Sequence, residues 1–142
     1  MAAISDGIYR IQFTNEQLLT SLDGSPGGPL VLLSPGEGST QDWIVENRGN
    51  GRCSIKDRDS NLYVSFEGEP DMHELAILLP EPRAWNLIPD KGRNSFIIGV
   101  EGAPMRLGMS LLKIFPPRVA LAPEYGPQYQ AWTFELVEEL VS

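Results

Sequence analysis

Side chains that could carry out covalent or acid–base chemistry are few in this sequence. Its only histidine, His73, lies in a polar stretch that predicts a hairpin loop, and its only cysteine, Cys53, lies in an apolar strand pattern. A Ser-His-Asp or Cys-His arrangement would have to use these two residues. We expect His73 to be a solvated surface residue and Cys53 to be a buried, unreactive thiol.

Other catalytic and ligand-binding patterns are also missing from the sequence. No Cys/His cluster has zinc spacing, and the acidic residues are scattered without marking a catalytic pair. Residues 24–28 are glycine-rich but lack the lysine and the following helix of a phosphate-binding loop. The sequence therefore predicts a binding protein rather than an enzyme, with no metal and no cofactor.

The composition is that of one ordinary globular domain, which we predict over residues 1–142. Hydrophobic residues make up 42% of the chain and charged residues 21%, enough for a real core. The formal net charge of −8 disfavours nucleic acid and membranes as partners. A lone cysteine cannot form an internal disulfide, and the N-terminus has no signal-peptide pattern. We therefore expect a cytoplasmic protein, with secretion by another route left open.

Three tryptophans, Trp43, Trp85 and Trp132, recur at intervals of 42 and 47 residues. Each follows a short apolar run that ends in proline, and these runs are residues 30–35, 75–80 and 119–123. Recurrence at such a period predicts a repetitive architecture. The tryptophans are then expected to hold the scaffold, which leaves function to the loops.

Each repeat has the pattern of four short strands. Twelve prolines and fourteen glycines leave little room for helices, whereas apolar and polar residues alternate over short windows. An opening strand is followed by a second strand, the proline-ended run and a strand that starts at the tryptophan. Twelve such strands in three pseudo-symmetric repeats (approximately 7–51, 52–93 and 94–138) predict an all-β protein with the β-trefoil fold. The alternative is an all-β sandwich or barrel without internal symmetry.

Several short segments resemble a known group of proteins. They are residues 7–11 (GIYRI), residues 43–46 (WIVE) with GNGR at 49–52, and residues 130–134 (QAWTF). Together they resemble the fungal (mushroom) β-trefoil protease inhibitors, which include the cospin-like serine protease inhibitors and, more distantly, the mycocypins clitocypin and macrocypin. The resemblance spans essentially the whole chain.

This resemblance implies a small, disulfide-free, cytoplasmic protein with a role in defence. It implies inhibition of a protease, more readily a serine than a cysteine protease, by a monomer that offers a rigid surface loop to the active site. An extended loop that the barrel already holds in place loses little entropy when it docks, so its contacts are retained as affinity.

In cospin-like inhibitors the loop between the second and third strands carries a basic residue for the primary specificity pocket of trypsin. The matching loop here, residues 24–29, contains Pro26, Gly27 and Gly28 but neither Lys nor Arg. Residues 124–129, before the last strand, match the loop of a related inhibitor and also lack a basic residue. Trypsin inhibition is therefore not predicted from either loop.

Other loops offer candidate contacts. Lys113, Ile114 and Phe115 lie in the third-repeat counterpart of the cospin loop, where two prolines restrict the backbone. In loop 57–61, Arg58 would suit a trypsin-like pocket, and Asn61 an asparaginyl endopeptidase, which mycocypins bind through the corresponding loop. A further pair of loops, residues 14–17 and 36–40, matches the pair that mycocypins insert into papain-like clefts.

Each candidate also has a simpler interpretation. Lys113, Ile114 and Phe115 would equally serve as capping residues of the barrel. Arg58 and Asn61 would equally be turn residues, since Asp, Asn and Ser favour turns. The glycine-rich loops would equally be permissive connections.

A carbohydrate-binding β-trefoil is the main alternative, because the Gln-x-Trp pattern also recurs in ricin-type lectins. A sugar site in those lectins adds an Asp, an aromatic stacking residue and an Asn or Gln in the same repeat. The comparable second-strand positions here are Asp23, Glu67 and Ser110, and only one repeat offers stacking aromatics, Tyr125 and Tyr129. An actin-binding or purely structural role stays open, whereas a heparin-binding factor would need a basic patch.

Overall fold

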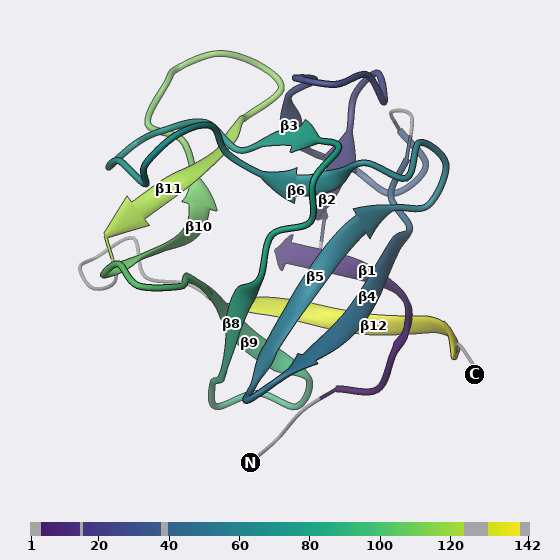
Figure 1. Cartoon of the computed structure of the whole chain (residues 1–142). Coiled ribbons are helices and arrows are strands. Elements are labelled where there is room, and N and C mark those ends of the chain that lie inside the picture. Colours follow the sequence, from purple (N-terminus) through teal and green to yellow (C-terminus); the bar gives the residue numbers. More distant parts are fainter. Residues whose placement is uncertain (1–3, 15, 38–39, 124–130, 140–142) are drawn as a thin grey trace.

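The computed structural model describes residues 4–14, 16–37, 40–123 and 131–139, and in this part of the chain it has twelve strands and no helix. Figure 1 shows their arrangement. The strands are β1 (Gly7–Thr14), β2 (Gln17–Ser21), β3 (Leu30–Leu33), β4 (Trp43–Gly49), β5 (Arg52–Asp57), β6 (Tyr63–Ser65), β7 (Ile77–Leu79), β8 (Trp85–Pro89), β9 (Ser95–Val100), β10 (Met105–Met109), β11 (Val119–Pro123) and β12 (Trp132–Glu139).

Six of these strands close into a barrel. β1 pairs with β4, β4 with β5, β5 with β8, β8 with β9, β9 with β12, and β12 again with β1. All six pairings are antiparallel, so each barrel strand has a neighbour on both sides. Alternation along the strands places apolar residues inside: Tyr9, Ile11 and Phe13 of β1 are buried, whereas Arg10 and Thr14 are exposed.

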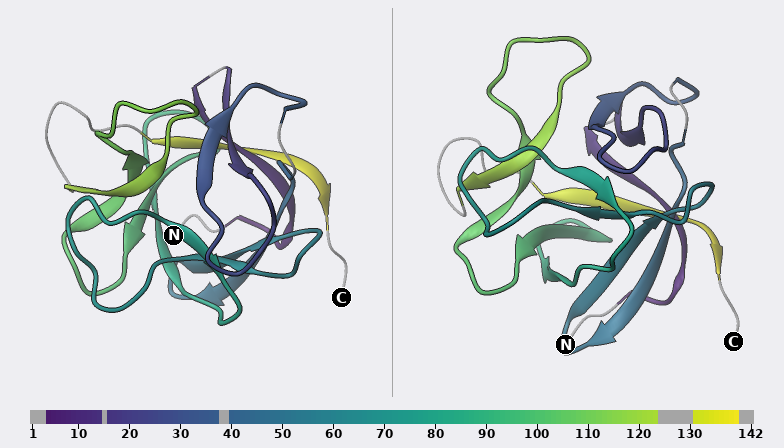
Figure 2. Two further views of the ribbon diagram at one scale, coloured as in Figure 1. Left: turned by 90° about the horizontal axis from the view of Figure 1, so that it is seen from above. Right: turned by 45° about the horizontal axis from the view of Figure 1, so that its top comes forward.

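The other six strands form three hairpins, β2–β3, β6–β7 and β10–β11, which cap one end of the barrel. Single β-bridges join each hairpin to the other two: Pro29 to Ile77, Val31 to Arg118, and Leu75 to Ala120. Seen from above, the three hairpins surround the barrel axis (Figure 2). Three repeats of four strands, six in a barrel and six in the cap, form a β-trefoil, which confirms the fold predicted from the sequence.

The three tryptophans occupy equivalent positions at the start of β4, β8 and β12, and all three are fully buried. Each indole N–H donates to a backbone carbonyl in the second strand of its own repeat. The acceptors are Leu19 for Trp43 (2.9 Å), Val64 for Trp85 (3.0 Å) and Leu107 for Trp132 (3.1 Å). The tryptophans therefore tie the barrel to each hairpin of the cap in the same way, as their spacing predicts.

Candidate binding loops

The loop between β10 and β11 projects furthest from the cap in Figure 1 and in the right-hand view of Figure 2. It carries four of the ten large apolar side chains that the described residues expose, including the most exposed one. The exposed fractions are 63% for Leu111, 54% for Leu112, 47% for Ile114 and 85% for Phe115. Four exposed apolar side chains within five residues form a convex apolar patch, of the kind that marks interaction surfaces.

Backbone hydrogen bonds hold the base of this loop. Ser110 N donates to Arg118 O (2.7 Å) across the base, and Leu32 N of the first repeat donates to Pro117 O (2.9 Å). Near the start of the loop, Leu112 N donates to Ser110 Oγ (3.1 Å). Pro116 and Pro117 add fixed φ angles on the β11 side. The apolar tip is thus carried by a loop whose base is fixed to two repeats.

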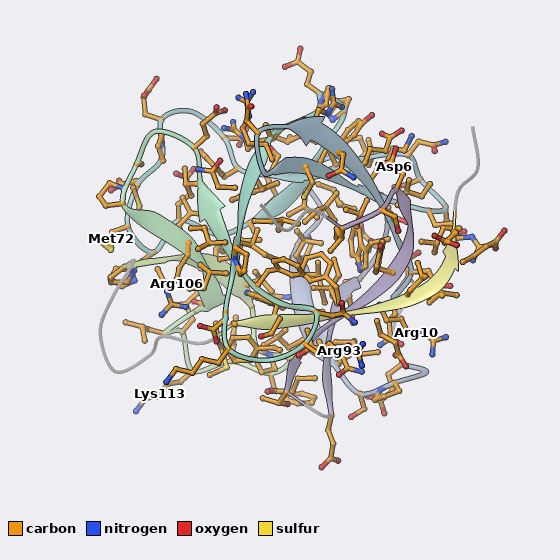
Figure 3. The ribbon with its side chains drawn as sticks, turned by 90° about the horizontal axis from the view of Figure 1, so that it is seen from below. Asp6, Arg10, Met72, Arg93, Arg106 and Lys113 are labelled. Carbon is orange, nitrogen blue, oxygen red and sulfur yellow. The ribbon has the colours of Figure 1, made fainter. Side chains whose placement is uncertain are left out.

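Lys113 lies in the middle of the apolar patch. Its side chain is exposed and reaches outward at the edge of the molecule (Figure 3). Among the described residues it has no ion pair. The structure therefore brings Lys113, Ile114 and Phe115 together on one exposed loop, whereas the capping interpretation would require Ile114 and Phe115 to be buried.

A cavity of about 220 Å³ lies beside Phe115, between the β10–β11 loop and the first repeat. Its lining includes Phe115 and Pro117 on one side and Leu32, Glu16 and Glu37 on the other. Phe115 therefore lines the same cavity as two acidic residues. Sequence reasoning missed this neighbourhood, because the two segments that form it are about 80–100 residues apart in the chain.

The β2–β3 loop, which contains the cospin-like position, folds back onto the second repeat. Gly27 N donates to Leu78 O (2.7 Å), and Leu78 N donates to Gly28 O (3.0 Å). Gly28 is buried, and a Cβ built on it would lie 2.6 Å from Asp23 Oδ1. Pro26 and Gly27 are exposed, but the backbone around them is bonded to β7 and not extended into solvent.

The β5–β6 loop is a turn whose charged side chains are already paired. Arg58 Nη1 lies 3.2 Å from Asp42 Oδ2, and Arg10 Nε lies 3.2 Å from Asp42 Oδ1. Asn61 is exposed and adopts a left-handed conformation (φ 64°), and its N–H donates to Asp57 O (3.0 Å). These are features of a turn. Arg10 and Asp42 are functional candidates that sequence reasoning missed, because only folding brings them to Arg58.

The charged network lines a polar cavity of about 400 Å³. Besides Arg10, Asp42 and Arg58, its lining includes Thr40 and Gln41, and none of its described lining residues is aromatic. Gln41 has a structural role here, because its Nε2 donates to Ser34 O (2.8 Å) and to Thr20 Oγ1 (3.2 Å). The Gln-x-Trp motif of the first repeat therefore braces the β3–β4 connection.

Arg83 occupies the Gln41 position in the second repeat and also braces its own repeat. Its guanidinium lies 3.7 Å from the centre of the Phe66 ring, and its Nε donates to Ser65 Oγ (2.8 Å). The positions predicted on the second strands, Asp23, Glu67 and Ser110, lie just beyond β2, β6 and β10. Asp23 accepts the N–H of Ser25 through Oδ1 (2.9 Å). Glu67 lines a separate cavity of about 470 Å³ that contains no exposed aromatic ring.

Several predicted positions lie wholly or partly outside the described residues. Loop 124–129, with Tyr125 and Tyr129, is outside them. The pair of loops 14–17 and 36–40 is described except for residues 15, 38 and 39. In its described part, Thr14 Oγ1 donates to Gln17 Oε1 (3.1 Å), and Gly36 N donates to Gln41 Oε1 (2.8 Å).

The residues with catalytic potential are placed as the sequence predicts. Cys53 is fully buried in β5, and burial raises the pKa of its thiol to about 12. His73 is exposed at a turn with φ 70°, and its N–H donates to Leu121 O (2.8 Å). Among the described residues, no three His, Cys, Asp or Glu side chains are grouped so that they could hold a metal ion. The described part of the chain contains no helix long and apolar enough to cross a membrane.

Comparison with known proteins agrees with the fold. No protein-family model and no curated protein sequence matches this chain. A designed threefold-symmetric protein, ThreeFoil, superposes with a TM-score of 0.80 at 18% identity, covering 93% of this chain and all of that one. A ricin B-like lectin from Macrolepiota procera in complex with lactose gives 0.80 at 20% identity, covering 96% of this chain and all of the lectin.

The Rhizoctonia solani agglutinin gives a TM-score of 0.80 at 13% identity, covering 96% of this chain and 99% of the agglutinin. Identities this low establish a common fold and leave the binding partner open. The chain is thus a β-trefoil protein, of the same architecture as the designed protein, the lectin and the agglutinin.

Proposed function

We propose that this protein inhibits a protease, of the serine class, by inserting its β10–β11 loop into the active-site cleft. The observation that carries this proposal is the exposure of Leu111, Leu112, Ile114 and Phe115 on one loop with a fixed base. Exposed apolar side chains do not stabilise the domain by itself. Their burial against a partner would be favourable. A convex loop fits a concave partner, and a protease cleft is such a partner.

The loop also suits inhibition because little order has to be gained on binding. Its base is bonded to the first repeat through Pro117 and closed by the pair Ser110 and Arg118. Two prolines reduce the number of conformations that the free loop can adopt. The contacts that the apolar side chains make are then retained as affinity instead of being offset by the entropy of ordering the loop.

The test is an inhibition panel with the purified full chain against trypsin, chymotrypsin, elastase, subtilisin, papain and an asparaginyl endopeptidase. We expect reversible inhibition of at least one serine protease. Replacing Leu111, Leu112, Ile114 and Phe115 together by serine should raise the inhibition constant by more than about tenfold, which corresponds to about 1.4 kcal/mol of binding free energy.

The matched control is the double variant Arg58→Ala and Asn61→Ala, which alters the β5–β6 loop and leaves the apolar loop intact. It should inhibit as the original protein does. Silence across the whole panel would contradict the proposal. So would inhibition that survives the serine replacements but is lost in the control, since the β5–β6 loop would then be the binding site.

Carbohydrate binding is the second candidate function, and the comparisons support it better than they support inhibition. Two of the structures with the same fold are a lectin in complex with lactose and an agglutinin. The polar cavity around Asp42 could accept hydroxyl groups. Against this candidate, Phe115 is the only exposed phenylalanine, tyrosine or tryptophan among the described residues, and it does not line that cavity.

A glycan array, followed by calorimetry with lactose, tests the second candidate. A glycan bound by the protein and lost in Asp42→Asn would favour the polar cavity as the site. Binding to glycans together with silence in the protease panel would replace inhibition by carbohydrate recognition as the function.

A further inference from the structure

We infer that Phe115 is the anchor residue of the β10–β11 loop, and that the target protease has a large apolar primary pocket, as chymotrypsin-like and subtilisin-like serine proteases do. This inference rests on the proposed function and adds the specificity of the target to it. The competing anchor on the same loop is Lys113, which would suit a trypsin-like pocket that ends in a carboxylate.

The first argument is the amount of apolar surface that each side chain can bury. Phe115 is 85% exposed, more than any other large apolar side chain that the structure describes. Nearly all of its ring is therefore available to a partner. Aromatic rings buried at the centre of an interface are the most frequent anchor residues, because they combine a large area with few rotatable bonds.

The second argument is the backbone around each residue. Phe115 is followed directly by Pro116 and Pro117, whose rings restrict φ, and Pro117 O accepts the hydrogen bond from Leu32 N (2.9 Å). The backbone at Phe115 is thus two residues from a fixed point on the first repeat. Lys113 follows Leu112, whose N–H donates to Ser110 Oγ (3.1 Å), but this bond lies within the loop and does not join it to another repeat. A preorganised anchor binds at a lower entropic cost.

The third argument is the character of the residues around Lys113. Its neighbours Leu112 and Ile114 are apolar and about half exposed, so a partner that covers the loop has to cover them too. A partner with an apolar binding surface matches all of these side chains. Lys113 fits the same arrangement, because a long side chain can lay its methylene groups along an apolar surface and keep its ammonium group in water.

The experiment measures inhibition constants of the full chain against chymotrypsin, subtilisin and trypsin. We compare the original protein with Phe115→Ala, Lys113→Ala and the conservative variant Phe115→Tyr. We expect inhibition of chymotrypsin or subtilisin, a loss of at least about 30-fold with Phe115→Ala, and changes within about threefold for Lys113→Ala and Phe115→Tyr. Both positions are exposed, so the melting temperatures of the three variants should stay within about 2 °C of each other.

Trypsin inhibition that Lys113→Ala abolishes would overturn the inference, as would inhibition of any of the three enzymes that Phe115→Ala leaves unchanged. In both cases the protein would still be a protease inhibitor, so only the assignment of the anchor would fail. No inhibition of any protease would remove the proposed function together with the anchor, and the two failures are therefore distinguishable.

Discussion

At the scale of single residues, the three tryptophans have the same structural role in each repeat. Trp43, Trp85 and Trp132 are fully buried, and each indole N–H reaches a backbone carbonyl at 2.9–3.1 Å. A buried carbonyl that loses its donor has no water to replace it, so each tryptophan contributes both packing and a hydrogen bond. The aromatic contacts add to this, since Phe13 lies 4.9 Å from Trp132 between ring centres.

We expect Trp43→Ala, Trp85→Ala and Trp132→Ala each to lower the free energy of unfolding by about 3–5 kcal/mol, the usual cost of emptying a core aromatic site. Chemical denaturation measures this. The matched variants with phenylalanine keep a ring and lose the N–H, and they should cost about 1–3 kcal/mol. Unchanged stability in all three alanine variants would contradict the role of these residues as the common brace of the repeats.

The thiol of Cys53 links stability to pH. Burial raises its pKa from 9.0 to about 12 in the folded protein, because the thiolate would lose its hydration. In the unfolded chain the thiol titrates near its ordinary value, so above that pH the unfolded chain binds fewer protons than the folded protein. The stability contributed by the neutral thiol is therefore complete below about pH 9 and is lost as the pH rises towards 12.

We predict that the free energy of unfolding falls by about 1 kcal/mol more between pH 8 and pH 10 in the original protein than in Cys53→Ala. Urea unfolding at a series of pH values measures this difference, and the variant corrects for all other groups that titrate. Parallel pH profiles for the two proteins would show that Cys53 does not couple to folding. Native protein should also resist thiol reagents that modify the unfolded chain.

At the scale of elements, the hairpins show which turns the sequence dictates locally. β4 and β5 are joined at Asn50 and Gly51, whose φ angles are 57° and 76°. Positive φ at both central residues is typical of the two-residue type I′ turn, for which Asn-Gly is the preferred pair. The turn conformation therefore follows from two adjacent residues, and the register of β4 and β5 follows from the turn.

Gly51→Ala should destabilise the protein by about 1 kcal/mol, because an L-residue with a Cβ is strained at positive φ. Asn50→Gly is the matched control and should be nearly neutral, since glycine tolerates the same conformation. Denaturation midpoints of the two variants give the comparison. A neutral Gly51→Ala would mean that the turn adopts another conformation in solution.

The longer loops of the cap hairpins depend on contacts outside themselves, unlike the two-residue turn between β4 and β5. Gly27 and Gly28 form hydrogen bonds to Leu78 of the second repeat, whereas the loop with Phe115 is fixed only at its base. The two loops are counterparts in the repeat pattern, so the pattern alone assigns them the same role. Only the contacts between repeats distinguish a loop that closes the cap from one that stands out from it.

At the scale of the whole molecule, ring closure makes the repeats interdependent. The first and last strands of the described chain, β1 and β12, pair with each other, and β4 pairs with β5 and β8 with β9 across the repeat boundaries. One hydrophobic core contains side chains from all three repeats. No repeat can bury its apolar face alone, so the domain should unfold as one unit.

We therefore predict one unfolding transition, with the same midpoint whether it is followed by tryptophan fluorescence or by far-ultraviolet circular dichroism. A tryptophan variant in any single repeat should shift this one midpoint and leave a single transition. Two separated transitions in any of the three variants would show that a repeat can unfold independently.

The sequence by itself determined the architecture, because short-range chemistry encodes it. Strand alternation, proline and glycine positions and the recurring tryptophans are local patterns, and they are enough to predict twelve strands in three repeats. The starts of β4, β8 and β12 at Trp43, Trp85 and Trp132 follow from these patterns. The proposed resemblance to protease inhibitors stays a prediction, since the comparisons concern the fold.

Only the tertiary structure decided which candidate loop is free to bind. Arg58 is paired with Asp42, Gly28 is buried against the second repeat, and Phe115 is left exposed. Each outcome depends on a partner from another segment of the chain. Arg58 pairs with Asp42, Gly28 is bonded to Leu78, and Pro117 accepts a hydrogen bond from Leu32. Such contacts form only when the barrel and its cap close, and local sequence patterns therefore do not predict them.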